Sequence, residues 1–309
     1  MTTDAPVTEA PGGLRQNRQV LDAETLRVVR TRAELDAVRS TLTGRVVLVP
    51  TMGALHDGHR ALMRAARAVG DHVIVSIFVN PTQFGPGEDL DRYPRTPVAD
   101  LGLCAEEGVA LVFMPEAEVM YGPGPGIRVD GGELADRLEG AVRRGHFSGV
   151  LTVVAKLFGM VGPQAAVFGE KDYQQLVLIR AMSRELALEV AVYGVPTVRG
   201  SDGMALSSRN RYLDTGQREV AAVLSHALRA GVSAAGDGAG GAAVLAAAHE
   251  MLGAEPELTL DYLVLTDPDL GPAPDSGPAR LLVAARVGTT RLIDNLPVTL
   301  SAVSGGVED

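Results

Sequence analysis

The sequence is poor in the residues on which several protein classes depend. It has a single cysteine, Cys104, which excludes an intrachain disulfide and a cysteine-based zinc cluster. Tryptophan is absent and aromatic residues make up 4%, which argues against a stacking platform for single-stranded nucleic acid. No apolar run approaches the roughly 20 residues of a membrane span. We therefore expect a cytoplasmic protein, in a reducing compartment, that binds neither membranes nor nucleic acids.

Acidic residues outnumber basic ones. The 309 residues include 38 Asp and Glu against 28 Lys and Arg, a net charge of −10 that is unfavourable for binding a phosphate backbone. At about 150 residues per domain, the length corresponds to roughly two domains. Residues 1–22 are rich in Thr, Ala, Pro and Gly, which predicts a flexible extension, and residues 304–309 are expected to be a frayed tail.

Short apolar runs alternate with helical patterns in the first part of the chain. The runs occupy residues 45–50, 72–79, 109–115, 165–169 and 189–195. Runs without polar alternation are typical of a buried parallel sheet, and the intervals suffice for crossover helices. One such helix is expected where Leu134, Leu138 and Val142 share a face. The pattern predicts an α/β, doubly wound (Rossmann-like) domain over residues 23–197, with ligands at the carboxyl ends of its strands.

The pattern changes after residue 197. Helical spacing continues over residues 220–228 and 244–251, and strand patterns follow at residues 258–265, 280–287 and 290–295. Consecutive strands separated by short turns indicate an antiparallel sheet. We predict a smaller α+β domain over residues 198–303 that acts as a lid.

Two histidines follow the first predicted strand, in the segment TMGALHDGH at residues 51–59. His56 and His59 are three residues apart, so on a helix they face the same way, beside the free N–H groups of the helix N-terminus. Such a pair is suited to donating hydrogen bonds to phosphate oxygens. Zinc binding and a purely structural role are the alternatives, although no HExxH pattern or cysteine partner supports zinc.

Further polar side chains follow other strands. Lys171 supplies a cation after the fourth strand, with Asp172 and Gln175 nearby, and Ser207, Ser208 and Arg209 form a loop suited to phosphate oxygens. The amides of Asn80 and Gln83 suit a small polar substrate, and the segment around His146 suits a pocket wall. A surface lysine, a solvated loop and plain turns are the alternatives.

Six motifs occur in a characteristic order: TMGALHDGH, FVNPTQF, RYPRT, RGHFSGVLTVV, FGEKDYQQL and LSSRNRYL. Together they resemble the pantoate–β-alanine ligase family of the HxGH nucleotidyltransferase superfamily. The resemblance implies that ATP and pantoate form pantoyl adenylate and pyrophosphate, and that β-alanine then gives pantothenate and AMP. It also implies Mg²⁺ on the phosphates and a homodimer.

The resemblance also implies roles for individual residues. Catalytic roles fall to His56, His59, Lys171, Ser207, Ser208 and Arg209. ATP would contact Met52, Gly53, Ala54, Leu55, His56, Asp57, Gly58, His59, Gly169, Glu170, Lys171, Asp172, Val198, Leu206, Ser207, Ser208 and Arg209. Pantoate and β-alanine would contact Met52, Asn80, Gln83, His146 and Gln175. Asp100 is the candidate residue on the metal side, in a stretch where the family often carries consecutive acids and this chain has Val98-Ala99-Asp100.

Two other functions remain open from the residues alone. One is an HxGH nucleotidyltransferase that acts on a phosphorylated acceptor, which would leave the paired glutamines unexplained. The other is a nucleotide sensor without catalysis. For the ligase, we expect closure of the lid to bring Ser207, Ser208 and Arg209 onto ATP, because an acyl adenylate must be shielded from water.

Overall fold

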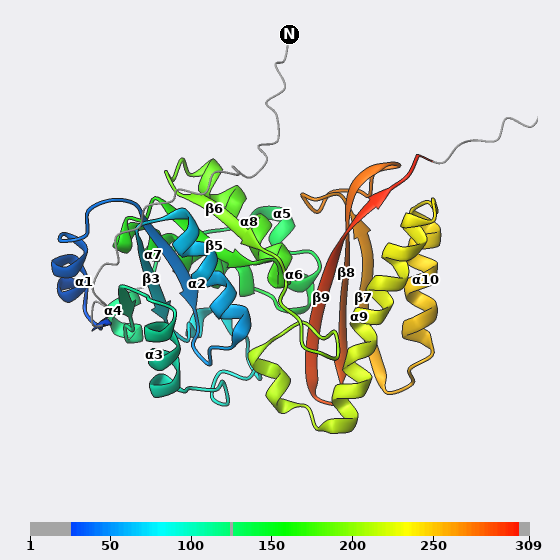
Figure 1. Ribbon diagram of the computed structural model, residues 1–309, viewed down its shortest axis with the longest axis horizontal. Helices are drawn as coiled ribbons and strands as arrows, with labels where there is room; N and C mark the ends of the chain where they lie inside the picture. Colours follow the sequence, from blue (N-terminus) through cyan, green and yellow to red (C-terminus); the bar gives the residue numbers. More distant parts are fainter. Residues whose placement is uncertain (1–25, 124–125, 303–309) are drawn as a thin grey trace, which may run out of the picture.

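The computed structural model describes residues 26–123 and 126–302 and shows two lobes, each built around its own sheet (Figure 1). The extension predicted at residues 1–22 and the tail at residues 304–309 lie outside the described residues. Within the described part of the chain, no helix combines the length and the apolar character needed to cross a membrane.

The first sheet has six parallel strands in the order β1-β4-β3-β2-β5-β6. The strands are β1 Arg27–Val29, β2 Val46–Thr51, β3 His72–Ile77, β4 Leu111–Phe113, β5 Ala165–Gly169 and β6 Ala191–Val195. The chain order reverses between β2 and β5, which is where a doubly wound sheet opens its binding crevice. The predicted fold class is confirmed, although the edge strand β1 was missed, because its three residues contribute only two apolar side chains between Arg27 and Arg30.

Helices cover both faces of this sheet. The helices are α1 Arg32–Arg39, α2 Asp57–Val69, α3 Pro97–Glu106, α4 Ala117–Tyr121, α7 His146–Val161 and α8 Tyr173–Glu185. Successive strand residues point to opposite faces. Val47 accordingly belongs to the core with Met63 of α2 and Cys104 of α3. Its neighbour Leu48 belongs to the other core, which α1, α4, α7 and α8 complete. Burial on both faces explains why the strands lack polar alternation.

The single helix predicted through Leu134, Leu138 and Val142 is wrong. The structure has two short helices there, α5 Gly132–Ala135 and α6 Glu139–Val142, and Leu138 between them adopts φ +51°. The side chain of Gln174 stabilises the break, since its Nε2 donates to the carbonyls of Leu134 and Arg137 and its Oε1 accepts from the Glu139 amide. A tertiary contact therefore overrides the local helical spacing.

The second lobe is the predicted α+β unit. Its antiparallel sheet consists of β7 Leu258–Thr266, β8 Gly277–Val287 and β9 Thr290–Leu300, and its helices are α9 Thr215–Gly236 and α10 Gly241–Gly253. The two helices cover one face of the sheet, while the other face is turned toward the first lobe (Figure 1). Tyr173 and Val177 of α8 pack there against Leu282 of β8.

Candidate active site

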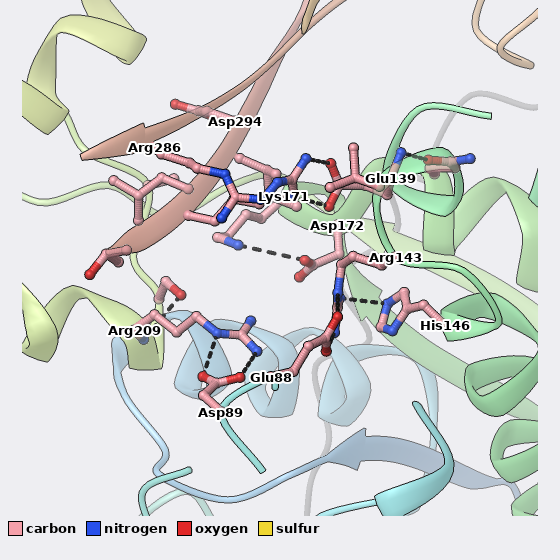
Figure 2. Close-up of a pocket in the computed structure, with 18 of the residues that line it drawn as sticks. Glu88, Asp89, Glu139, Arg143, His146, Lys171, Asp172, Arg209, Arg286 and Asp294 are labelled. Carbon is pink, nitrogen blue, oxygen red and sulfur yellow. Dashed lines mark hydrogen bonds and ion pairs between the residues drawn. The ribbon is translucent and has the colours of Figure 1, made fainter. Parts of the chain in front are cut away.

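The candidate site lies where β2 and β5 end side by side. A cavity of about 230 Å³ opens there, and a larger one of about 800 Å³ continues between the two lobes. Both cavities are lined by Lys171, Asp172, Gln175, Ser207 and Arg209, so they form one cleft. Figure 2 shows the charged side chains that face its larger part. The crevice expected from the strand order is therefore present and bordered by both lobes.

The two histidines form the N-terminal cap of α2. The Gly58 amide donates to Nδ1 of His56 at 3.1 Å, and the His56 amide donates to Nδ1 of His59 at 3.2 Å. A backbone amide can only donate, so both Nδ1 atoms are acceptors, and in the neutral rings Nε2 carries the proton. Both residues line the smaller cavity, where each ring can offer one N–H donor.

Burial keeps the two rings neutral. It lowers the pKa of His56 to about 4, with the positive charge of Lys171 adding to the effect. Burial and the neighbouring His56 lower the pKa of His59 to about 3. At neutral pH the pair therefore presents hydrogen-bond donors without positive charge, and the charge opposite an anion comes from Lys171 and the arginines.

His146 is held between two protein partners. Nη1 of Arg143 donates to its Nε2 at 2.9 Å, so Nδ1 carries the proton and donates to the carbonyl of Gln83 at 2.8 Å. Burial, with the charge of Arg143, lowers the pKa of His146 to about 4. The ring lines both cavities, but its two nitrogens are already occupied by Arg143 and by the backbone carbonyl of Gln83.

The three neutral histidines predict a specific loss of stability in mild acid. Their folded pKa values lie below the ordinary value of 6.5, so the unfolded chain binds more protons between about pH 6.5 and 4. The melting temperature should be highest above pH 6.5 and fall steadily toward pH 4. His146→Asn should flatten this slope in a series of melting curves, and the same change at the exposed His249 should not. A slope unchanged by His146→Asn would contradict the assignment.

Asp100 lies beneath the loop that precedes the histidines. It is 2% exposed, and its carboxylate accepts from the amides of Ala54 at 3.0 Å and Leu55 at 2.8 Å and from the Thr96 hydroxyl at 3.1 Å. It lines neither cavity. These contacts do not fit the metal-side role expected from the sequence, because both oxygens are already used to hold the loop.

We expect Asp100→Asn to lower the melting temperature without changing the Mg²⁺ requirement. The amide nitrogen would replace an oxygen that faces a backbone donor, and a buried unsatisfied donor costs about 1–3 kcal/mol. Thermal unfolding and a Mg²⁺ titration of activity measure the two effects separately. A higher Mg²⁺ requirement at an unchanged melting temperature would restore the metal role.

Lys171 lies in the short helix η2 Glu170–Asp172, directly after β5. Its ammonium is 3.5 Å from the Asp172 carboxylate and its side chain is 19% exposed. The Asn295 amide of β9 donates to the carbonyls of Glu170 and Lys171, both at 2.9 Å. The second lobe therefore helps to hold the backbone that positions this lysine.

The segment LSSR crosses from the second lobe into the site. Ser207 caps the short helix η3 Ser208–Tyr212, and the Ser208 hydroxyl donates to the Ala54 carbonyl at 3.2 Å. Arg209 makes a bidentate pair with Asp89 at 2.8 and 2.9 Å (Figure 2). These residues already border the cavity in the structure described, and the expected closing movement stays a prediction.

Most of the residues expected at the site line the smaller cavity. They are Met52, His56, Gly58, His59, Asn80, Gln83, His146, Gly169, Lys171, Asp172, Gln175, Val198, Leu206, Ser207, Ser208 and Arg209. Others line neither cavity: Gly53, Ala54, Leu55, Asp57, Asp100 and Glu170. Gly53, Ala54 and Leu55 form the loop under the histidines, and Glu170 instead pairs with Arg280 of the second lobe.

Three features of the cavity were not predicted from the sequence: Arg143, Tyr93 and an apolar wall. Arg143 pairs with Glu88 as well as His146, and adjoins the motif RGHFSGVLTVV (Figure 2). Tyr93 lies inside the motif RYPRT and lines the cavity. The wall comprises Phe78, Val150, Val153, Val154, Leu157 and Phe168. Its members on α7 recur at helical spacing, which also describes a core helix, so the pattern could not separate cavity from core.

In the described part of the chain, no group of three or more His, Cys, Asp or Glu side chains is arranged to hold a metal ion. The Nδ1 atoms of His56 and His59 are occupied by backbone amides. The cavity combines neutral hydrogen-bond donors, one ammonium, hydroxyls and two guanidinium groups with an apolar wall. This arrangement suits a polyanion next to a partly apolar molecule.

Comparison with known proteins agrees with this chemistry. A family described as Pantoate-beta-alanine ligase matches residues 26–297. A pantothenate synthetase of Nocardia farcinica is 60% identical over 277 residues, which covers 89% of this chain and 86% of the relative. A pantothenate synthetase of Salinispora arenicola is 58% identical over 279 residues and covers 90% and 99%.

Solved structures point the same way. The pantothenate synthetase from Thermus thermophilus superimposes with a TM-score of 0.84 at 52% identity, covering 87% of this chain and 98% of that one. The pantoate–β-alanine ligase from Francisella tularensis, complexed with β-γ ATP and β-alanine, gives 0.74 at 33% identity and covers 88% and 97%. With the family match over most of its length and relatives this similar, the chain belongs to the pantoate–β-alanine ligase family.

Proposed function

We propose that the chain condenses pantoate with β-alanine to give pantothenate, AMP and pyrophosphate, through a pantoyl adenylate. Its family membership supports the overall reaction. One observation supports the mechanism. His56, His59, Lys171 and the LSSR segment converge on the same cavity as Gln83 and Gln175. A phosphate site and an acid site thus adjoin, as transfer of an adenylyl group to a carboxylate requires.

In the first step, a carboxylate oxygen of pantoate attacks the α-phosphorus of ATP. An O–P bond forms, the bond to the bridging oxygen breaks, and pyrophosphate leaves. Negative charge grows on the phosphate oxygens, where Lys171, Arg209 and the Nε2–H groups of His56 and His59 stabilise it. Arg209 is held by Asp89 in the structure, so its guanidinium is fixed in direction before the nucleotide enters.

In the second step, the neutral amine of β-alanine attacks the acyl carbon of the adenylate. A C–N bond forms, AMP leaves with the electrons of the C–O bond, and the amine proton passes to solvent. The lobes must exclude water until then, because the mixed anhydride hydrolyses readily. The hydrogen bonds from Ser208 to Ala54 and from Asn295 to Lys171 join the two lobes beside the cavity.

We propose that Asp172 is the carboxylate that, together with the phosphates of ATP, would hold Mg²⁺. Magnesium in nucleotide sites is usually held by phosphates, waters and one or two carboxylates. Asp172 lines both cavities and its side chain is 50% exposed, so an oxygen is accessible beside Lys171. When bound, the ion would offset charge on the phosphates.

The two-step reaction predicts isotope exchange in the absence of β-alanine. With labelled pyrophosphate, ATP, Mg²⁺ and pantoate, label should enter ATP, because the first step is reversible while the adenylate stays bound. Omitting pantoate is the control and should abolish exchange. Active protein that makes pantothenate yet catalyses no exchange would reject the adenylate intermediate.

The same mixture tests the two other functions. A nucleotidyltransferase for a phosphorylated acceptor would not consume pantoate, and a nucleotide sensor would bind ATP without releasing pyrophosphate. A homodimer and a cytoplasmic location remain part of the proposal. Sedimentation of the purified chain and fractionation of cells test them.

A further inference from the structure

The amide of Asn80 is fully occupied by protein partners. Its oxygen accepts from the Tyr121 hydroxyl at 2.5 Å, the Thr82 hydroxyl at 2.9 Å and the Thr82 amide at 3.2 Å. Its nitrogen donates to Oε1 of Gln83 at 3.0 Å and to the Gly149 carbonyl at 3.1 Å. The residue is 1% exposed. Asn80 therefore has no remaining donor to offer the substrate contact that the sequence suggested.

These partners determine the direction of the Asn80 amide. The Thr82 backbone N–H can only donate and the Gly149 carbonyl can only accept, so oxygen and nitrogen cannot be exchanged without losing both bonds. The Asn80 nitrogen therefore donates to Gln83, and the atom of Gln83 that accepts this hydrogen bond must be Oε1. The Nε2 group of Gln83 is left for the cavity, where its protein partner is the weakly accepting sulfur of Met52 at 3.2 Å.

We infer that Tyr121 is a positioning residue for the acid substrate: its hydroxyl holds the Asn80 amide in place, and Asn80 in turn holds Gln83 with its N–H donor toward the cavity. The inference rests on the proposed function, in which Gln83 contacts pantoate. A donor at this point recognises a carboxylate or hydroxyl oxygen and disfavours an ammonium. The relay thus contributes to selection of a hydroxy acid over an amino acid of the same shape.

The surroundings of Tyr121 suit this role. It is the last residue of α4 and lines neither cavity, and the centre of its ring lies 6.2 Å from that of the Phe78 ring. Burial raises the pKa of its hydroxyl, which therefore keeps its proton through the ordinary pH range. The Thr82 hydroxyl, 3.1 Å from the Tyr121 oxygen, is the second side-chain donor to Asn80.

Tyr121→Phe tests the relay because it removes only the hydroxyl. Loss of one buried neutral hydrogen bond typically changes an equilibrium about 3- to 10-fold, and we expect kcat/KM for pantoate to fall by that factor. The KM for ATP and the KM for β-alanine should stay within about 2-fold. Tyr173→Phe is the matched control, since its hydroxyl bonds to the Pro268 carbonyl and it lines neither cavity.

A double-mutant cycle with Gln83→Ala separates positioning from general support of the fold. If Tyr121 acts through Gln83, Tyr121→Phe should have no further effect on pantoate kinetics in the Gln83→Ala background. Independent, multiplying effects would overturn the inference, as would wild-type pantoate kinetics in Tyr121→Phe alone. Should Tyr121→Phe fold poorly, Thr82→Val removes the second donor and should shift the same parameter in the same direction.

Failure of the proposed function gives a different result. If Gln83→Ala leaves the pantoate KM unchanged, the substrate contact itself is wrong, and the relay has no substrate to position. If Gln83→Ala raises the pantoate KM but Tyr121→Phe does not, only the relay is wrong.

Discussion

Replacing Lys171 with alanine is expected to slow formation of the adenylate by about 100-fold or more. Loss of one preorganised partner of the transition-state charge commonly has an effect of this size. The sequence contains only two lysines, Lys156 and Lys171, so positive charge is otherwise supplied by arginine. Lys171, at the end of β5, is one of the two positions where the chain uses lysine, and its compact ammonium lies beside Asp172.

A single-turnover measurement with excess enzyme reports this step directly. Arg184→Ala is the control, because Arg184 is an exposed cation on α8 outside both cavities. Lys171→Arg should remain slow although it keeps the charge, since the planar guanidinium is larger than the ammonium. A near-normal single-turnover rate for Lys171→Ala would remove Lys171 from the proposed mechanism.

Gly149→Ala should impair use of pantoate more strongly than any other single methyl group added to α7. A Cβ at Gly149 would lie 2.4 Å from the Thr82 carbonyl oxygen and 2.7 Å from Cα of Gln83. These are backbone atoms, so the segment carrying Asn80 and Gln83 must move. Overpacking of this kind typically costs about 1–3 kcal/mol. We expect kcat/KM for pantoate to fall more than about 10-fold, with a lower melting temperature.

Gly159→Ala provides the matched control on the same helix. No atom lies within 4 Å of its added Cβ, and alanine stabilises a helix interior by about 0.5–1 kcal/mol relative to glycine. Its kinetics should be unchanged and its melting temperature equal or higher. Steady-state kinetics with each substrate and thermal unfolding distinguish the two variants. Normal pantoate kinetics in Gly149→Ala would show that the segment carrying Asn80 and Gln83 can move without affecting the use of pantoate.

The fold class could be predicted because its signals are local and repeated. The runs at residues 45–50 and 72–79 lack polar alternation, since both faces of β2 and β3 are covered by helices. The rule that ligands bind at the carboxyl ends of parallel strands then predicted where polar side chains would gather, and the histidine pair and Lys171 line the cavity there. Their roles came from resemblance to a family, because residue types alone left zinc binding and a structural role open.

Contacts between distant segments decided what the sequence could not. The break at Leu138 depends on the side chain of Gln174, and the position of Asp100 depends on the amides of Ala54 and Leu55. Neither partner is recognisable from spacing, because each contact joins residues at least 35 positions apart. For the same reason Arg143, which pairs with Glu88 55 positions away, carried no signal of its own.

The amino-acid sequence was sufficient to predict the fold class and the edge of the sheet at which the chemistry lies, since both follow from periodicity and chain direction. The protonated nitrogen of His56, His59 and His146, and the end of the Gln83 amide that faces the cavity, emerged only in three dimensions. Those features depend on which donor or acceptor lies opposite each atom, and hydrogen-bond direction is a property of the assembled site.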